Sequence, residues 1–350
     1  MEIVNVLKIF IPATAAFFIG IAITPAVTHY LYKYKLWKKK ARNEALGGGG
    51  TPLFHELHKN KEVGTPKMGG VVIWLSASVT IFGFWLLSLW YPTDATEKMN
   101  FLSRSQTWLP LFTLIVASIV GLFDDILAVL GRGGYVAGGL PLSLRIATVL
   151  AIGAVGAWWF FVKLGVSTIA VPFLGELSLG IFFIPFFMLV MLALFSGGVI
   201  DGIDGLAGGI LAASFAAYAG IAFFQNQIDL AVFSAVIVGG ILAFLWFNIP
   251  PARFYMSETG MLGLTTTLTV IAFLTKEVLV LPLIAFFLFA AAVSDIIQIF
   301  SKKFFGRKVF LIAPIHHHFE ALGWPSYKVT MRFWVLSGVL AILGMVIALI

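Results

Sequence analysis

The chain has 350 residues, of which 60% are hydrophobic and 11% are charged, and its mean hydropathy is +1.00. A soluble domain of this length cannot hide so much apolar surface, so the composition excludes a soluble protein and indicates a polytopic membrane protein. The absence of cysteine excludes a disulfide framework. The formal net charge of +7 indicates a basic face suited to anionic lipid or an anionic substrate.

Ten apolar stretches long enough to cross a bilayer follow one another along the chain. They cover residues 7–32, 68–90, 109–130, 142–164, 181–200, 206–224, 230–247, 261–274, 278–300 and 331–350. We therefore predict an all-α polytopic integral membrane protein with about ten transmembrane helices, in which residues 1–350 form a single transmembrane domain. The first stretch lacks a small-residue cleavage site and ends in lysines, so we expect it to be retained. Pro172 and Gly175 punctuate an apolar connection, which predicts a short external β-hairpin within residues 166–179.

The distribution of lysine and arginine predicts which loops face the cytoplasm. With an external N-terminus, 18 of the 23 basic residues lie in or beside the internal loops, and five remain outside. Because cytoplasmic loops of membrane proteins are enriched in lysine and arginine, the pattern predicts an N-out, C-out topology. The internal loops at residues 33–67, 126–141, 201–205, 248–260 and 301–330 are then expected to form one active-site face.

Four groups of polar residues fall on this predicted cytoplasmic side. They are the pair Asp124-Asp125, the segment Asp201-Gly-Ile-Asp204, the segment from Asn248 to Glu258, and the run His316-His-His318. Ionisable residues at bilayer depth are costly and usually functional. Simpler structural interpretations are a solvated helix end, an Asp-Gly turn and a solvated loop carboxylate. That all four groups share one side favours a common site.

The residue types in these groups indicate phosphate chemistry. Carboxylate oxygens suit Mg²⁺ or Mn²⁺, which bind through one or two carboxylates and substrate phosphates. Zinc is disfavoured, because three consecutive histidines do not converge on one tetrahedral centre. We expect His29, His55 and His58 to be structural or solvated, and Asp295 to be a helix-end group. A basic site of this kind at the lipid boundary predicts a phosphorylated substrate, and a lipid phosphate is one candidate.

Six motifs carry a resemblance to a known family. They are Gly64-Thr-Pro-Lys-Met-Gly-Gly70, Gly121-Leu-Phe-Asp-Asp125, Asp201-Gly-Ile-Asp-Gly-Leu-Ala207, Asn248-x-Pro-Pro-Ala252, Ala313-Pro-Ile-His-His-His-Phe-Glu320 and Gly323-Trp-Pro325. In this order, and with the ten predicted spans, they resemble the phospho-MurNAc-pentapeptide translocase family over almost the whole chain. The triple histidine is the most specific motif, since it separates this family from relatives that transfer N-acetylhexosamine phosphates.

The resemblance implies a Mg²⁺-dependent transferase, with Mn²⁺ as an alternative metal. Its reaction moves phospho-MurNAc-pentapeptide from UDP-MurNAc-pentapeptide to undecaprenyl phosphate and yields lipid I and UMP. This is the first membrane step of peptidoglycan synthesis, which serves cell wall biogenesis, cell shape and cell division. The resemblance also implies a multi-pass homodimer of the bacterial inner (plasma) membrane, with an active site facing the cytoplasm and no nucleic-acid partner.

The resemblance also implies a role for each site residue. The catalytic residues are expected to be Asp124, Asp125, His316, His317 and His318. Glu258, together with the two aspartates, is expected to bind the metal. The residues that bind uridine and the diphosphate are expected to be Asp201, Gly202, Ile203, Asp204, Asn248 and Tyr255. Lys67 is added to this set for its positive charge and not by resemblance.

Several positions depart from the pattern of the family. Glu258 stands where the family usually has Asp, Ala128 where it has Lys, and Lys67 where it has Thr. A second lysine of the family is replaced by Glu62. Lys67 is therefore a candidate to supply the positive charge that is lost at positions 62 and 128.

Two other functions and two mechanisms remain open from sequence. The chain is alternatively a polyprenyl-phosphate transferase for another UDP-sugar such as UDP-GlcNAc, or a non-catalytic relative that binds nucleotide sugar or lipid. Either the lipid phosphate attacks the donor directly, or an aspartate attacks first and forms an acyl-phosphate. We favour direct attack, because a phosphate monoester has a second pKa of about 6 and is largely deprotonated at pH 7. Asp124 would then assist the acceptor, and Glu258 would hold Mg²⁺ on the diphosphate.

Overall fold

The computed structural model describes residues 3–38, 63–103, 105–131 and 138–350. His55, His58 and Glu62 lie outside the described residues, as do 39–62 and 132–137 of two predicted loops. Most of the described chain is helical, as predicted. Its long helices are α1 (Ile3–Lys33), α3 (Val71–Trp90), α5 (Trp108–Val129), α6 (Leu142–Trp158), α7 (Phe183–Ser196), α8 (Leu206–Phe224), α9 (Ile228–Asn248), α10 (Ser257–Leu274), α12 (Phe286–Phe305) and α14 (Ser326–Ala348).

Short elements connect these helices. They are α4 (Asp94–Met99), a π-helical turn (Trp159–Lys163), the strands β1 (Thr168–Val171) and β2 (Gly175–Ser178), two 3₁₀ turns (Gly180–Phe182 and Gly197–Ile200), α11 (Leu281–Ile284) and α13 (Ile315–Ala321). The strands pair antiparallel, with Thr168 opposite Ser178 and Val171 opposite Gly175. The predicted β-hairpin is therefore present.

In the described part of the chain, nine helices are long and apolar enough to cross a membrane, one fewer than the ten predicted. The difference lies in the predicted span 278–300, which forms the separate helices α11 and α12. Helix α12 carries three charged residues, Asp295, Lys302 and Lys303, so it is not an uninterrupted apolar span. Asp295 lies in the middle of this helix and not at a helix end, as was predicted. The all-α polytopic fold is confirmed, and only the continuity of this one span was wrong.

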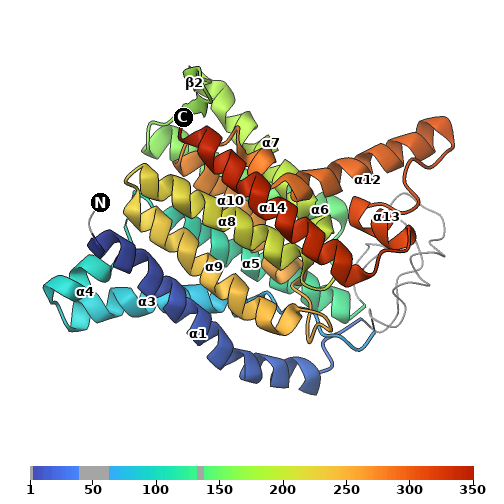
Figure 1. Ribbon diagram of the computed structural model, residues 1–350, viewed down its shortest axis with the longest axis horizontal. Helices are drawn as coiled ribbons and strands as arrows, with labels where there is room; N and C mark the ends of the chain where they lie inside the picture. The colour runs from blue at the N-terminus through green and yellow to red at the C-terminus, as the bar shows by residue number, and fades with distance from the viewer. Residues whose placement is uncertain (1–2, 39–62, 104, 132–137) are drawn as a thin grey trace.

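The α11–α12 segment nevertheless runs from one end of the bundle to the other. The chain just before it lies at the hairpin end, where Ala170 N donates to Lys276 O at 3.1 Å. Figure 1 shows α12 extending towards α13 at the opposite end, while the N-terminus, the C-terminus and β2 lie at the hairpin end. Nine helices plus this segment make an even number of passes, which places both termini at the same end.

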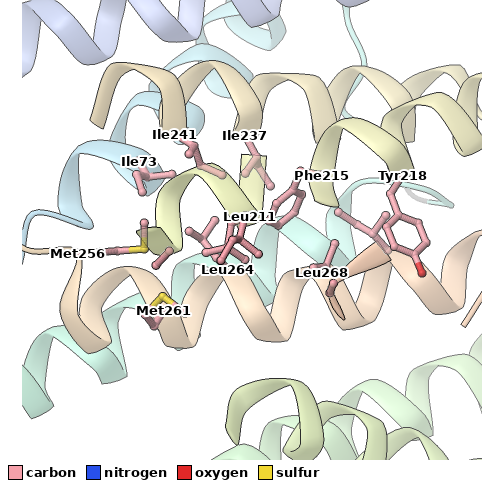
Figure 2. Packing of buried hydrophobic residues seen from close by; sticks show 14 of the residues in the cluster. Ile73, Leu211, Phe215, Tyr218, Ile237, Ile241, Met256, Met261, Leu264 and Leu268 are labelled. Carbon is pink, nitrogen blue, oxygen red and sulfur yellow. The ribbon is translucent and has the colours of Figure 1, made fainter. Parts of the chain in front are cut away.

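The centre of the bundle is formed by α8, α9 and α10. Figure 2 shows side chains from α3, α8, α9 and α10 meeting in one cluster that includes Ile73, Leu211, Ile237 and Leu264. Helix association in a membrane depends on close packing of small residues rather than on exclusion of water. Gly121 of α5 meets this requirement, because a Cβ there would lie 2.1 Å from the Glu258 backbone oxygen. This close approach brings the end of α5 next to the start of α10.

Candidate active site

Asp125 is bonded through both of its carboxylate oxygens. It lies near the end of α5 and is 0% exposed. Lys67 Nζ lies 2.8 Å from Oδ1. Oδ2 accepts from the backbone N and the Oγ1 of Thr259 at 2.9 and 2.7 Å. With three donors on its two oxygens, Asp125 joins the loop before α3 to the first turn of α10.

Asp124 faces the connection between α5 and α6. Leu140 N donates to its Oδ1 at 2.6 Å, and an Arg145 nitrogen lies 2.7 Å from its Oδ2. The connection reaches the carboxylate through Gly139, which has φ +93°. A Cβ at this position would lie 2.7 Å from Asp124 Oδ1, so the close approach requires glycine.

Arg145 links Asp124 to Glu258. Its second guanidinium nitrogen lies 2.7 Å from Glu258 Oε1, and its Nε donates to Leu140 O at 3.2 Å. This role was not predicted, since Arg145 was counted only among the 18 basic residues in or beside the predicted internal loops. The available signal was the position of Arg145 in the first turn of α6, shortly after Gly138 and Gly139. The sequence does not indicate that this turn lies against α10.

Lys67, the predicted source of positive charge, lies in the same charged centre. Its backbone N donates to Leu36 O at 2.8 Å, which fixes the loop that carries it. Burial lowers the pKa of Lys67, but the negative charges of Asp125, Glu258 and Asp124 outweigh burial and raise the pKa above its ordinary value. Lys67 therefore remains charged at neutral pH. Three carboxylates and two cations share this centre.

The turn at residues 201–204 lies against the loop that leads into α10. Ser257 N donates to Asp201 Oδ2 at 2.8 Å, and Ala252 N donates to Asp204 Oδ2 at 3.2 Å. Burial raises the pKa of Asp201 to about 6. Asn248 joins the same two segments, because its side chain accepts from Gly205 N at 2.9 Å and donates to Phe254 O at 2.8 Å.

Two of the three consecutive histidines approach this turn. His316 and His317 are 0% and 3% exposed. A Cβ placed on Gly202 would lie 2.6 Å from His317 Nε2 and 2.8 Å from His316 Nε2. His318 is held elsewhere, since its Nδ1 accepts from Leu311 N at 3.2 Å. The structure thus brings His316 and His317, but not His318, to the predicted uridine-binding turn.

Glu320 orients His317 and was not predicted as a site residue. Its Oε2 lies 2.7 Å from His317 Nδ1, and its Oε1 accepts from Ser326 Oγ at 2.6 Å. A carboxylate on one ring nitrogen of a histidine fixes the orientation of the other nitrogen. The signal in the sequence was the three-residue spacing from His317 to Glu320, which places both on one face of α13.

Ile203 and Tyr255, both predicted to bind uridine or the diphosphate, lie in different environments. Ile203 is 6% exposed and belongs to the hydrophobic core. Tyr255 binds through its backbone, where its N donates to Pro66 O and its O accepts from Gly69 N, both at 2.8 Å. These bonds hold the Lys67 loop beside α10. The structure thus places Tyr255 next to the charged centre.

Asp124 and Glu258 are the candidate oxygen ligands for a metal in this centre. Within the described residues, no three acidic or histidine side chains are arranged as a ready metal site. Asp124 and Glu258 nevertheless lie at ion-pair distance from the same guanidinium. Two carboxylates that already share one cationic partner have the chemistry that Mg²⁺ uses. They also line a small cavity together with Val120, Leu140, Arg145, Thr148, Phe195 and Leu262.

Comparison with known proteins gives the class first. Residues 107–276 match the family model "Glycosyl transferase family 4", and this segment contains the aspartate pair, Arg145 and Glu258. The protein is therefore a polytopic membrane protein with a glycosyl transferase family 4 region.

The more similar relatives define the family more closely. The chain is 33% identical to the phospho-N-acetylmuramoyl-pentapeptide-transferase of Anoxybacillus flavithermus over 96% of both chains. It is also 33% identical to that of Latilactobacillus sakei, over 93% of this chain and 94% of the relative, and 34% identical to that of Chloroflexus aggregans, over 90% and 85%. The chain thus belongs to the phospho-N-acetylmuramoyl-pentapeptide-transferase family.

Proposed function

We propose that this protein transfers phospho-MurNAc-pentapeptide from UDP-MurNAc-pentapeptide to undecaprenyl phosphate, giving lipid I and UMP. Family membership supports the donor and the acceptor. The observation that carries the proposal is the joining of Asp124 and Glu258 by Arg145, beside the Lys67–Asp125 ion pair. A centre with both signs of charge is suited to an anionic diphosphate and a developing phosphoryl charge.

The chemistry proposed for this centre is an in-line displacement. A phosphate oxygen of the lipid attacks the β-phosphorus of the donor, the bond between that phosphorus and the bridging oxygen breaks, and UMP leaves with the electron pair. Lys67 and Arg145 supply positive charge towards the diphosphate. The role of Asp124 is to orient the acceptor phosphate.

Direct attack is favoured over an acyl-phosphate at Asp125. The three donors to Asp125, from Lys67 and Thr259, would have to be weakened before either oxygen attacked phosphorus. Hydrogen bonds from charged and backbone donors lower the nucleophilicity of a carboxylate because they stabilise its negative charge. Asp125 is therefore proposed to anchor Lys67 and the start of α10.

Mg²⁺, with Mn²⁺ as an alternative, is proposed as the cofactor. Glu258 and Asp124 would hold it, with Asp125 beside them, and when bound it would neutralise charge on the donor diphosphate. The convergence of the first two carboxylates on one cationic group supports this assignment. Glu258 reaches the shared position with one methylene more than the Asp usual in the family.

His317 and the turn at 201–204 are proposed to recognise the donor. His316 and His317 lie against Gly202, and the contact between Glu320 and His317 Nδ1 leaves Nε2 of the same ring facing the turn. A ring N–H of histidine is a suitable donor to a phosphate oxygen. The proposed uridine pocket comprises this turn with Asn248 and Tyr255.

The protein is further proposed to be a homodimer in the bacterial plasma membrane, with this site facing the cytoplasm. The asymmetric distribution of lysine and arginine supports the orientation. Its reaction would be the first membrane step of peptidoglycan synthesis, on which cell shape and cell division depend.

The test is a comparison of donors with the purified protein. Undecaprenyl phosphate and Mg²⁺ are supplied with either UDP-MurNAc-pentapeptide or UDP-GlcNAc, and UMP release is measured with and without EDTA. We expect release with the MurNAc donor and its loss with EDTA. Release only with UDP-GlcNAc would assign a different sugar, and silence with both donors from folded protein would contradict a transferase.

A further inference from the structure

The guanidinium of Arg145 occupies the space between two carboxylates that come from different helices. Asp124 lies on α5 and Glu258 on α10, and each has an oxygen 2.7 Å from a separate Arg145 nitrogen. Arg145 itself is held from the other side by Leu140 O, at 3.2 Å from Nε. The planar fork of arginine makes this double contact, which the single nitrogen of lysine does not reproduce.

The Arg145 side chain is closely packed in this position. It is 13% exposed, and Gly139 packs so closely that a Cβ there would lie 2.9 Å from its guanidinium nitrogen. In a buried environment a charge without a partner is strongly disfavoured. Arg145 therefore stays between the carboxylates until another cation takes its place or an anion attracts it.

A divalent cation bound to these same carboxylates would meet the guanidinium at close range. Two positive groups that share the same oxygens repel each other, and this repulsion is large where solvent is excluded. Binding of the metal and seating of the guanidinium between Asp124 and Glu258 therefore exclude each other.

We propose that Arg145 competes with the divalent cation for Asp124 and Glu258, and that the guanidinium released on metal binding pairs with the donor diphosphate. Arg145 is then a positioning residue that holds the two carboxylates together before the substrates arrive. The inference rests on the proposed function for the identity of the anion, but the competition itself requires neither substrate. Arginine suits both partners, since its fork binds carboxylate and phosphate alike.

The test measures metal binding directly, without donor or lipid. Mn²⁺ is titrated into the purified full-length protein and free Mn²⁺ is followed by electron paramagnetic resonance. Arg145→Gln is expected to bind Mn²⁺ about tenfold more tightly than wild type, within the usual range for coupling between two ligands. Its turnover is expected to fall, because the partner of the diphosphate is lost.

Lys67→Gln is the matched control. It removes the same charge from the same centre, but its partner is Asp125 and it does not lie between Asp124 and Glu258. A smaller gain in Mn²⁺ affinity for Lys67→Gln supports competition at one position, whereas equal gains would reduce the effect to general electrostatics and overturn the proposal. Mn²⁺ binding that is unchanged or weaker in Arg145→Gln would also overturn it.

Arg145→Lys keeps the proposal testable if the glutamine variant does not fold. It retains the charge and loses the double contact, so Mn²⁺ should bind more tightly than to wild type but less tightly than to Arg145→Gln. Because the titration contains no substrate, a failure of UMP release leaves its result readable. Conversely, active enzyme with no change in Mn²⁺ affinity would overturn only the competition.

Discussion

Replacement of Gly202 by alanine tests the position of the histidines at the site. The backbone of Gly202 is one that alanine also adopts, since its φ is not positive. The added Cβ would lie 2.6 Å from His317 Nε2, whereas ordinary contacts begin at 3.4 Å. The His317 ring must therefore move by about 0.8 Å, and with 3% exposure it has little space in which to do so.

A displacement of this size has a large expected cost in catalysis. Misplacement of a catalytic group by 1 Å lowers rates by up to about 10²-fold, so we expect kcat for UMP release to fall between about 10- and 100-fold. The assay is UMP release at saturating UDP-MurNAc-pentapeptide and undecaprenyl phosphate. Thermal unfolding in detergent shows whether the variant is folded.

Gly198→Ala is the matched control for this substitution. It lies in the preceding 3₁₀ turn, and its added Cβ would meet Met261 at 3.8 Å, an ordinary contact. We expect it to retain activity within a few-fold of wild type. If Gly202→Ala were as active as Gly198→Ala, the histidines would not lie against the turn as described.

Three further predictions concern the surroundings of the site. In Gly121→Ala the added Cβ would lie 2.1 Å from the backbone oxygen of Glu258, so this variant should destabilise the fold by about 1–3 kcal/mol or more. Gly83→Ala is its control: a Cβ there would have nothing within 4 Å, so thermal unfolding should be unchanged. Glu320→Ala should lower kcat about 10- to 100-fold, as is typical for a residue that orients a ligating or catalytic side chain. Glu320→Gln should lose less activity, because its amide still bonds to His317. Equal losses in the two variants would argue against this orienting role. Burial raises the pKa of Asp201 from 3.8 to about 6, so the folded protein binds this proton more tightly than the unfolded chain does. The free energy of unfolding therefore falls as the pH rises from about 4 to about 6, and it stays lower above that range. Asp201→Asn should therefore raise the unfolding temperature at pH 7 but not at pH 4, and a gain of equal size at both would contradict the assignment.

The fold was largely predictable because membrane helices leave a strong signal in hydropathy. The one error, at 278–300, arose because apolar length does not reveal where a helix breaks. The break lies at Ala285, where φ is −105° and ψ is 34°, and alanine is by itself a strong helix former. The hairpin was predictable from Pro172 and Gly175, since turn residues act locally.

The sequence indicates most residues of the candidate site, but it does not indicate Arg145, Glu320 or the contacts that connect the residues. The acidic pair and the histidine run stand out in an apolar chain, and the motifs place them in one family. The Arg145 bridge depends on the approach of α6 to α10 across the end of α5, which no local pattern encodes. The separation of His318 from His316 and His317 likewise follows from the short helix α13, whose consecutive side chains point in different directions.

UMP release from wild type and from Asp125→Asn, measured side by side, tests whether the charged centre carries the reaction. Both proteins receive UDP-MurNAc-pentapeptide, undecaprenyl phosphate and Mg²⁺, and both are first shown to be folded. Asp125→Asn preserves the size of the side chain but removes the charge that holds Lys67 at 2.8 Å. We predict release by wild type and its loss in the variant; near-normal release by Asp125→Asn would contradict the account of the charged centre.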